Sequence, residues 1–486
     1  MEAALATLVV AVGIVGLFRL YRDRESRVSH ALWLPVAWFS LGGSRTVTQW
    51  LGAGMYTESP DQYLDGSPID RAIFSVLIVA SLVILIARWE RTREVLARNW
   101  PLLLFLLFCA VSVAWSEFPF VALKRWTKTL GNVAMMMIVL TEFDPLSAIK
   151  QLLARAAFVL IPVSVLVILF YSEIGTYYRP YAPVNTSLLY AGVASNKNML
   201  GCLCMILGLG ILSQIIDVLQ QATRRGGRLL ALGVVLGMDL WLLNITNSAT
   251  GVVCFVFGVV ALVVLRLAPR ERAKSAQLLV VGATVLGVVT FACYVVFRGV
   301  LVLPVEMLGR DPTLNGRDEL WRRALELSTN PWIGTGFESF FLGPRLERLW
   351  ALFIFHPNQA HNGYLETYLT LGFVGLGLLG LVMIVAFRDA MRLHSIDPRA
   401  GGLVLAYLAI APIYNLTEAA FKVMHPFWII SLLAIAAASY LPARMQARHR
   451  ADGTDTPTDT DTLTLERTAA ARGAALVLSW LGGRRG

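Results

Sequence analysis

Long uninterrupted runs of apolar residues limit the possible folds of this sequence more than any other feature. A helix needs about 20 apolar residues to cross a bilayer. The clearest runs of this kind are 2–18, 71–87, 152–171, 198–216, 229–244, 249–265, 277–297, 362–387 and 426–441. Shorter or more polar runs are 31–42, 101–115, 129–141 and 402–416. Only 15% of the 486 residues are charged, against roughly 25% in a soluble domain. The sequence therefore predicts an all-α polytopic membrane protein with about 12–13 transmembrane helices.

The basic residues indicate how these spans are oriented. Most lysines and arginines fall on alternate connections, and such a bias marks the cytoplasmic side. The N-terminus lacks a basic region before its apolar run, so we predict a first span there and not a cleavable signal. An extracytoplasmic N-terminus then places the connection 298–361 outside. The same bias explains the net charge of +10 without a nucleic acid partner.

The chain divides into two regions by composition. We predict a polytopic membrane domain over residues 1–441, with 298–361 as a large periplasmic loop. The remainder, 442–486, contains a polar low-complexity run that cannot bury a core, so we expect a disordered cytoplasmic tail. The five cysteines all lie in apolar runs and are predicted to be small buried residues.

Ionisable residues collect near the outward ends of the predicted spans. They are Lys124, Arg125, Arg179, Lys197, Arg310, Arg317, His356, His361 and Glu418. An ionisable group at membrane depth is costly unless it is paired or faces an aqueous cavity. Arginine binds two phosphate oxygens through parallel hydrogen bonds, and lysine supplies a point charge. The cluster therefore favours a diphosphate site, although a single basic residue at a span end more often only reaches lipid headgroups.

His361 is the leading candidate for a general base. It precedes a predicted span in which Asn362, Glu366 and Thr370 lie on one helical stripe, which must face protein or a cavity. A neutral imidazole, with an ordinary pKa of about 6.5, can accept a proton from an attacking hydroxyl. No carboxylate or cysteine group completes a metal site between His356 and His361, so we expect no metal and no cofactor.

The segment before this histidine has its own local pattern. Residues 316–329 have the spacing of an amphipathic helix, and Asn330-Pro331 ends it. Gly334 and Gly336 in IGTGF then predict a tight turn in preference to a phosphate-binding loop, because the strand and helix of a nucleotide fold are missing.

Several of these segments resemble one known family. GRDELWRRALELSTNPWIGTGFESFF, followed by AHNGYLETYLTLGFVGLGLL, resembles the signature region of the O-antigen ligase and polymerase superfamily. SVAWSEFPFVALKRWTKTLGNVAMM, GVASNKNMLG and TNSATG look like its exopolysaccharide polymerisation branch. The resemblance covers about residues 101–425 and is most specific over 316–377. It implies an inverting GT-C-type glycosyltransferase of the bacterial inner membrane with its active site facing the periplasm.

The resemblance also implies roles for individual residues. His361 matches the acceptor base, Arg317 matches the arginine that holds the donor diphosphate, and Arg125 matches the arginine after a WS-x-x-P motif. Lys197 matches the lysine of an H-K-N motif, although Asn196 replaces the histidine. Glu418 resembles an acidic residue of the last outer loop.

The substrates and partners follow from the same resemblance. The donor would be an undecaprenyl-diphosphate-linked glycan, the acceptor a glycan or a lipid, and the surroundings membrane lipids. A chain-length regulator and a flippase would be partners. The alternatives that remain open are a ligase that transfers finished chains to lipid A core or a protein, a membrane transporter, and a non-catalytic scaffold.

Overall fold

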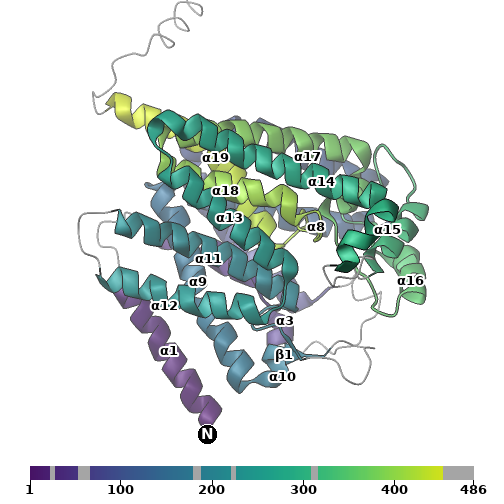
Figure 1. Cartoon of the computed structure of the whole chain (residues 1–486), viewed down its shortest axis with the longest axis horizontal. Helices are drawn as coiled ribbons and strands as arrows, with labels where there is room; N and C mark the ends of the chain where they lie inside the picture. The colour runs from purple at the N-terminus through teal and green to yellow at the C-terminus, as the bar shows by residue number, and fades with distance from the viewer. Residues whose placement is uncertain (22–27, 53–65, 179–187, 221–225, 308–315, 452–486) are drawn as a thin grey trace, which may run out of the picture. The chain divides into compact units, whose positions relative to one another are not determined.

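The computed structural model describes residues 1–21, 28–52, 66–178, 188–220, 226–307 and 316–451 (Figure 1). Within these ranges the chain is almost entirely helical. The one sheet there is a short antiparallel pair, β1 (Thr176–Tyr177) with β2 (Leu189–Tyr190). These observations confirm the predicted all-α class.

Every predicted span coincides with a helix. The nine clear runs form α1 (Glu2–Tyr21), α5 (Pro68–Ala87), α9 (Pro145–Phe170), α11 (Lys197–Leu219), α12 (Gly226–Ile245), α13 (Ala249–Leu267), α14 (Ala273–Met307), α17 (Gly363–Ile396) and α19 (Pro426–Ala451). The four weaker runs form α2 (Trp33–Gly43), α7 (Trp100–Val111), α8 (Pro119–Leu140) and α18 (Pro398–Tyr414). Shorter helices lie between them: α3 (Val47–Trp50), α6 (Trp89–Arg98), α10 (Ser172–Gly175), α15 (Arg317–Glu326) and α16 (Gly343–Leu352).

The number of helices that can cross a membrane is smaller than the number of predicted spans. Among the described residues, nine helices are long and apolar enough, or ten when α6 and the segment that follows it, bent by 87°, count as one span. α2 has 11 residues, α18 has 17, and α8 carries Lys124, Arg125 and Lys128. The polytopic membrane class is confirmed, and the predicted 12–13 spans require these three helices to cross as well.

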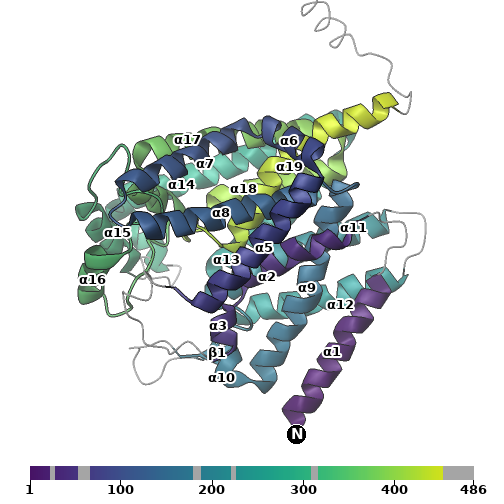
Figure 2. The ribbon, with the colours of Figure 1, turned by 180° about the vertical axis from the view of Figure 1, so that it is seen from behind.

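Two kinds of helix are distinguished by burial. The apolar stretches of α11 and α19 are 78% and 89% buried, whereas those of α1 and α5 are 6% and 11% buried. α1 lies at the edge of the bundle in Figures 1 and 2 and exposes Leu8 and Val12 there. Outer helices with apolar surfaces of this size fit a lipid environment.

Two predicted boundaries and one predicted burial differ in the structure. α14 continues through Met307, so the long connection begins later than residue 298. α19 continues to Ala451, so the predicted tail 442–486 begins as helix, and its part beyond 451 lies outside the described residues. The residues Met1–Tyr440 form one compact unit, to which Leu441–Ala451 does not belong. Four cysteines are buried as predicted, but Cys293 is exposed.

α17 is broken near its first third. Gly372 has φ 65° and ψ −165°, a backbone conformation that is not helical. The break frees the carbonyls of Leu369 and Thr370 and the N–H groups that follow Gly372, and buried backbone groups of this kind must find other partners.

The IGTGF turn supplies those partners. Thr335 N–H donates to the Leu369 carbonyl at 3.1 Å, and Gly336 N–H donates to the Thr370 carbonyl at 2.9 Å. In return, the Phe373 and Val374 N–H groups donate to the carbonyls of Pro331 and Trp332 at 2.8 and 3.0 Å. The predicted turn is confirmed, and its function is to fill the break in α17.

Glycine is required on both sides of this contact. Gly334 also has a positive φ of 65°. A Cβ there would lie 2.4 Å from the carbonyl carbon of Thr370, and one at Gly372 would lie 2.2 Å from that of Trp332. We expect Gly334→Ala and Gly372→Ala each to lower the free energy of unfolding by about 2–4 kcal/mol, because left-handed strain adds to a backbone clash. Thermal unfolding of the purified protein measures this loss.

Gly377→Ala is the matched control, because a Cβ at this helical glycine of α17 meets nothing within 4 Å. It should leave stability unchanged or slightly higher. Equal effects at positions 372 and 377 would contradict the interlocking of the turn with the break.

Candidate active site

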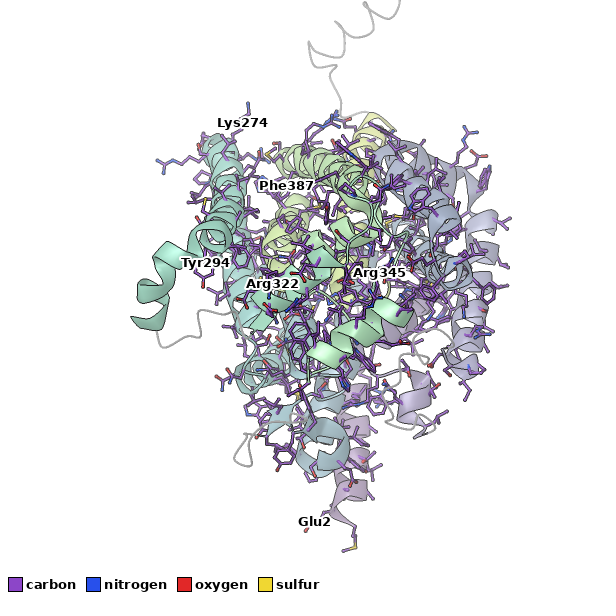
Figure 3. The ribbon with its side chains drawn as sticks, turned by 90° about the vertical axis from the view of Figure 1, so that its right-hand side faces the viewer. Glu2, Lys274, Tyr294, Arg322, Arg345 and Phe387 are labelled. Carbon is purple, nitrogen blue, oxygen red and sulfur yellow. The ribbon has the colours of Figure 1, made fainter. Side chains whose placement is uncertain are left out.

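Polar residues from distant parts of the chain meet at one end of the helical unit. Arg317 begins α15, His361 precedes α17, Glu418 lies between α18 and α19, and Asn198 lies in the first turn of α11. Figure 3 views this end, with Arg322 of α15 and Arg345 of α16 toward the viewer. α15 and α16 lie at the opposite end from the adjoining ends of α11 and α12 (Figures 1 and 2).

Glu418 is the centre of the hydrogen-bond network here. Its Oε1 accepts from Asn198 Nδ2 at 2.9 Å and pairs with Arg317 Nη2 at 3.2 Å. Its Oε2 lies 3.3 Å from His361 Nδ1. Arg317 also donates from Nη1 to the carbonyl of Thr417. One buried carboxylate therefore joins α15, α11 and the segment before α17.

The electrostatics of Glu418 follow from these contacts. Burial alone would raise the pKa of its carboxyl group, because the charged form loses hydration. The hydrogen bond from His361 and the guanidinium of Arg317 more than offset this, so the pKa of Glu418 lies below its ordinary value. Glu418 is an anion at neutral pH.

The contact with Glu418 determines which nitrogen of His361 is available. A carboxylate only accepts hydrogen bonds, so Nδ1 carries the hydrogen and Nε2 keeps its lone pair. The amide of Gln359 is also 3.3 Å from Nδ1, but the charge-assisted contact is the stronger one. His361 lines a cavity of about 170 Å³ together with Lys197 and Glu418. The arrangement can accept a proton from a group bound in that cavity.

A second cavity of about 390 Å³ adjoins the first. Its lining includes the carboxylates of Glu338 and Glu366 and the cations of Arg125, Lys128 and Lys422. The two cavities share the lining residues Asn196, Met199, Gln359 and His425. Mixed charges next to the aromatic side chains of Phe340 and Phe341 suit a ligand that is part sugar and part anion.

The charged groups of the larger cavity are held by neighbouring backbone. Glu366 accepts from Ala360 N–H at 2.7 Å and lies 3.4 Å from Lys422 Nζ. Arg125 donates to the carbonyl of Glu338, whose side chain accepts from Val423 N–H at 3.0 Å. The segment 415–425 therefore contributes to both cavities.

His425 differs from His361 in its tautomer. Phe427 N–H donates to His425 Nδ1 at 3.2 Å, so the hydrogen of the neutral ring is on Nε2. Loss of hydration lowers the pKa of His425 to about 4, so the ring is neutral at pH 7. His425 can donate a hydrogen bond to a ligand, whereas His361 can accept a proton.

Backbone strain is concentrated around these cavities. Among the described residues, five non-glycine residues have positive φ, namely Asn247, Glu338, His356, His361 and Met424, with values from 44° to 61°. Glu338, His361 and Met424 line the cavities. The carbonyl of Asn247 accepts from Lys197 Nζ at 3.1 Å. Strain that clusters in this way is typical of functional sites.

The predicted site residues do not all have the same surroundings. His361, Arg317 and Glu418 are in contact, and Lys197 lines the cavity of His361. Arg125 and Glu366 line the larger cavity. Asn362 instead caps α17, accepting from the N–H groups of Tyr364 and Leu365 at 3.0 and 2.9 Å. Arg179 lies outside the described residues.

The sequence reasoning missed several residues of this region, namely Asn198, Glu338, Lys422 and His425. Asn198 directly follows the predicted site residue Lys197, which is the one signal that could have indicated it. The other three residues belong to no motif or spacing that predicts a site. Within the described residues, no group of three His, Cys, Asp or Glu side chains is placed to hold a metal ion.

Comparison with known proteins bears on this site. Residues 232–380 match the family described as O-antigen ligase, a range that contains Arg317, His361 and Glu366. The chain is also 28% identical over 312 residues to the exopolysaccharide production protein ExoQ of Rhizobium meliloti (strain 1021). That match covers 62% of this chain and 67% of the relative.

The resemblance to the O-antigen ligase and polymerase superfamily is confirmed. The two matches support an O-antigen ligase or polymerase type of function in polysaccharide biosynthesis, carried out by a multi-pass membrane protein. The family implies polysaccharide and lipid-linked glycan substrates.

The Glu418 network predicts a pH-dependent stability. The folded-state pKa of this carboxyl group is depressed, so its contribution is full above the ordinary pKa of about 4.3 and is lost as the pH falls through the depressed value. Glu418→Gln should lower the free energy of unfolding by about 1–3 kcal/mol at pH 7. Thermal unfolding at pH 7 and pH 4 should show a smaller difference from wild type at the lower pH. Glu347→Gln, at an exposed carboxylate of α16, is the control and should have little effect at either pH.

Proposed function

We propose that this protein is an inner-membrane glycosyltransferase that polymerises undecaprenyl-diphosphate-linked oligosaccharide repeats into an exopolysaccharide or O-antigen-type polysaccharide. The single observation that carries the proposal is the contact chain from Arg317 through Glu418 to His361, beside a cavity lined by further cations. It provides an oriented base and an anion-binding surface at adjoining positions. The matches to O-antigen ligase and to ExoQ supply the substrate class.

The reaction needs one proton transfer. The acceptor hydroxyl attacks the anomeric carbon of the donor while its proton passes to His361 Nε2. The bond from that carbon to the diphosphate oxygen breaks, and the electron pair leaves with the diphosphate. Attack from the side opposite the leaving group inverts the configuration, as expected of a GT-C-type inverting enzyme.

Glu418 stabilises the imidazolium that forms. It is anionic before the reaction and lies 3.3 Å from Nδ1, so it orients the ring and offsets the new positive charge. Arg317 contacts both Glu418 and the Thr417 carbonyl. We therefore assign to Arg317 the positioning of Glu418, in place of the direct diphosphate contact expected from the family resemblance.

The cations of the larger cavity are proposed to bind the diphosphate of the donor. Arg125, Lys128 and Lys422 line it, and Lys197 lines the adjoining cavity. Positive groups that face a departing diphosphate stabilise the charge developing on it, so neither a nucleotide-binding fold nor a metal ion is required by the proposed mechanism. Glu366, which holds Lys422, keeps one of these cations in place.

The location of the reaction follows from the arrangement of the helix ends. The sequence between α11 and α12 is rich in arginine, and a basic connection favours the cytoplasmic side. The adjoining ends of these two helices lie opposite to α15 and α16 (Figure 1). The proposed site then faces the periplasm. A flippase that delivers the donor and a chain-length regulator are the partners proposed for such a polymerase.

A ligase is the second candidate, favoured by the description of the matching family. It would use the same base and donor site and would differ in the acceptor. The purified protein, given lipid-linked single repeats alone, distinguishes the two, because a polymerase forms longer chains and a ligase needs another acceptor.

The assignments of His361 as the base and of Arg317 as the residue that positions Glu418 are tested by His361→Ala and Arg317→Ala. Both variants should fold and insert, reduce polymer formation by about a hundredfold or more, and accumulate lipid-linked single repeats. Arg317→Lys should recover part of the activity, because an ammonium can still pair with Glu418. Polymer length on gels and analysis of the lipid-linked pool are the measurements.

His356→Ala is the matched control for His361. His356 stacks on Trp350 with ring centroids 4.5 Å apart and lines neither cavity. Its variant should make polymer of normal length. Normal polymer in the His361 variant would remove the catalytic assignment.

A further inference from the structure

A third cavity, of about 600 Å³, lies between α5 and α8. These two helices pack side by side on the face shown in Figure 2. The volume is within the usual range of ligand pockets, roughly 300–1,000 Å³. Its lining includes the basic residues Arg71, Lys124, Arg125 and Lys128 and the aromatic and apolar residues Phe74 and Ile78. We call it the α5/α8 groove.

The groove is continuous with the proposed active site. Arg125 and Lys128 line both the α5/α8 groove and the 390 Å³ cavity. A ligand held by these two cations can therefore extend in two directions, toward Glu366 on one side and along α5 on the other.

The groove has an excess of positive charge. Among the described residues of its lining, Arg71, Lys124, Arg125 and Lys128 are cations and Asp70 is the one carboxylate. That carboxylate is already engaged, since it accepts from Thr48 N–H at 3.2 Å. Four cations with one occupied carboxylate are complementary to a diphosphate.

The groove is apolar further along α5. Phe74 and Ile78 follow Arg71 at successive helical turns, and Lys128 Nζ lies 4.9 Å from the centre of the Phe74 ring. Beyond the groove α5 exposes apolar side chains, including Val79 at 60% and Ile86 at 70%. A ligand with an anionic head and a hydrocarbon tail would keep its tail on this surface and continue into the lipid.

We infer that the α5/α8 groove binds the first isoprenyl units of a polyprenyl diphosphate, with the diphosphate at Arg125 and Lys128, which the groove shares with the 390 Å³ cavity, and the sugar directed into that cavity. This inference rests on the proposed function, because it supplies the site of the donor's lipid. It also explains why the basic residues of α8 are at the boundary between two cavities. The donor's anomeric carbon then lies on the His361 side of its phosphates.

The test is a binding measurement on the full-length protein in phosphatidylglycerol-containing nanodiscs, with undecaprenyl diphosphate as the probe. Ser75→Trp places a large side chain at an exposed position that lines the groove. It should weaken binding about tenfold or more. Val76→Trp, one residue later and 67% exposed outside the groove lining, is the matched control and should bind like wild type.

The charged part of the groove needs a second pair of variants. Lys124→Gln combined with Lys128→Gln should weaken undecaprenyl diphosphate about tenfold or more, whereas Lys274→Gln, at the exposed start of α14, should not. Inorganic diphosphate should bind more weakly than the lipid and should be unaffected by Ser75→Trp. Inorganic diphosphate binding as tightly as the lipid would overturn the assignment, and so would equal affinities of the Ser75→Trp and Val76→Trp proteins.

Binding and transfer are measured separately, so the two proposals can fail separately. His361→Ala should bind undecaprenyl diphosphate as wild type does, because His361 does not line the groove. Normal polymer in that variant would contradict the proposed function and leave the groove measurement valid. Loss of binding only in the groove variants supports the groove as the lipid site.

Discussion

The interlocking of the 331–336 turn with the break in α17 is the contact on which the rest of the site depends. Each partner leaves buried backbone groups unpaired, and each satisfies those of the other through the hydrogen bonds of Thr335, Gly336, Phe373 and Val374. Without this contact, both segments would leave these buried backbone groups without hydrogen bonds. The contact fixes the chain that leads to Glu338 on one side and the first turns of α17 on the other.

The base and the cations of the site lie in different surroundings. Glu418 neutralises Arg317 and orients His361, whereas Arg125 and Lys128 lie at a boundary between cavities. A carboxylate therefore lies beside the base, and cations predominate where an anion is proposed to bind. Strained residues, His361 and Glu338 among them, line the two cavities of the site.

The sequence predicted the helices well because each one needs a long apolar run, and a run is visible without knowledge of its neighbours. It also predicted that His361 and Glu418 belong to one region, since both are polar residues next to spans. It could not show that Arg317 contacts Glu418, because about a hundred residues separate them and only folding brings them together. The stripe that contains Asn362 could be recognised in the sequence but its helix cap could not, because a cap and a ligand contact use the same residue type.

The break at Gly372 divides α17 into a short piece that carries Glu366 and a longer piece that continues to Ile396. At about 1.5 Å per residue, the apolar stretch 373–387 beyond the break is about 22 Å long, which is less than the roughly 30 Å of a bilayer's hydrocarbon core. The piece that carries Glu366 must therefore supply part of the crossing. A change in membrane thickness acts on both sides of Gly372, so the depth of the membrane and the position of the site's carboxylate are coupled through this helix.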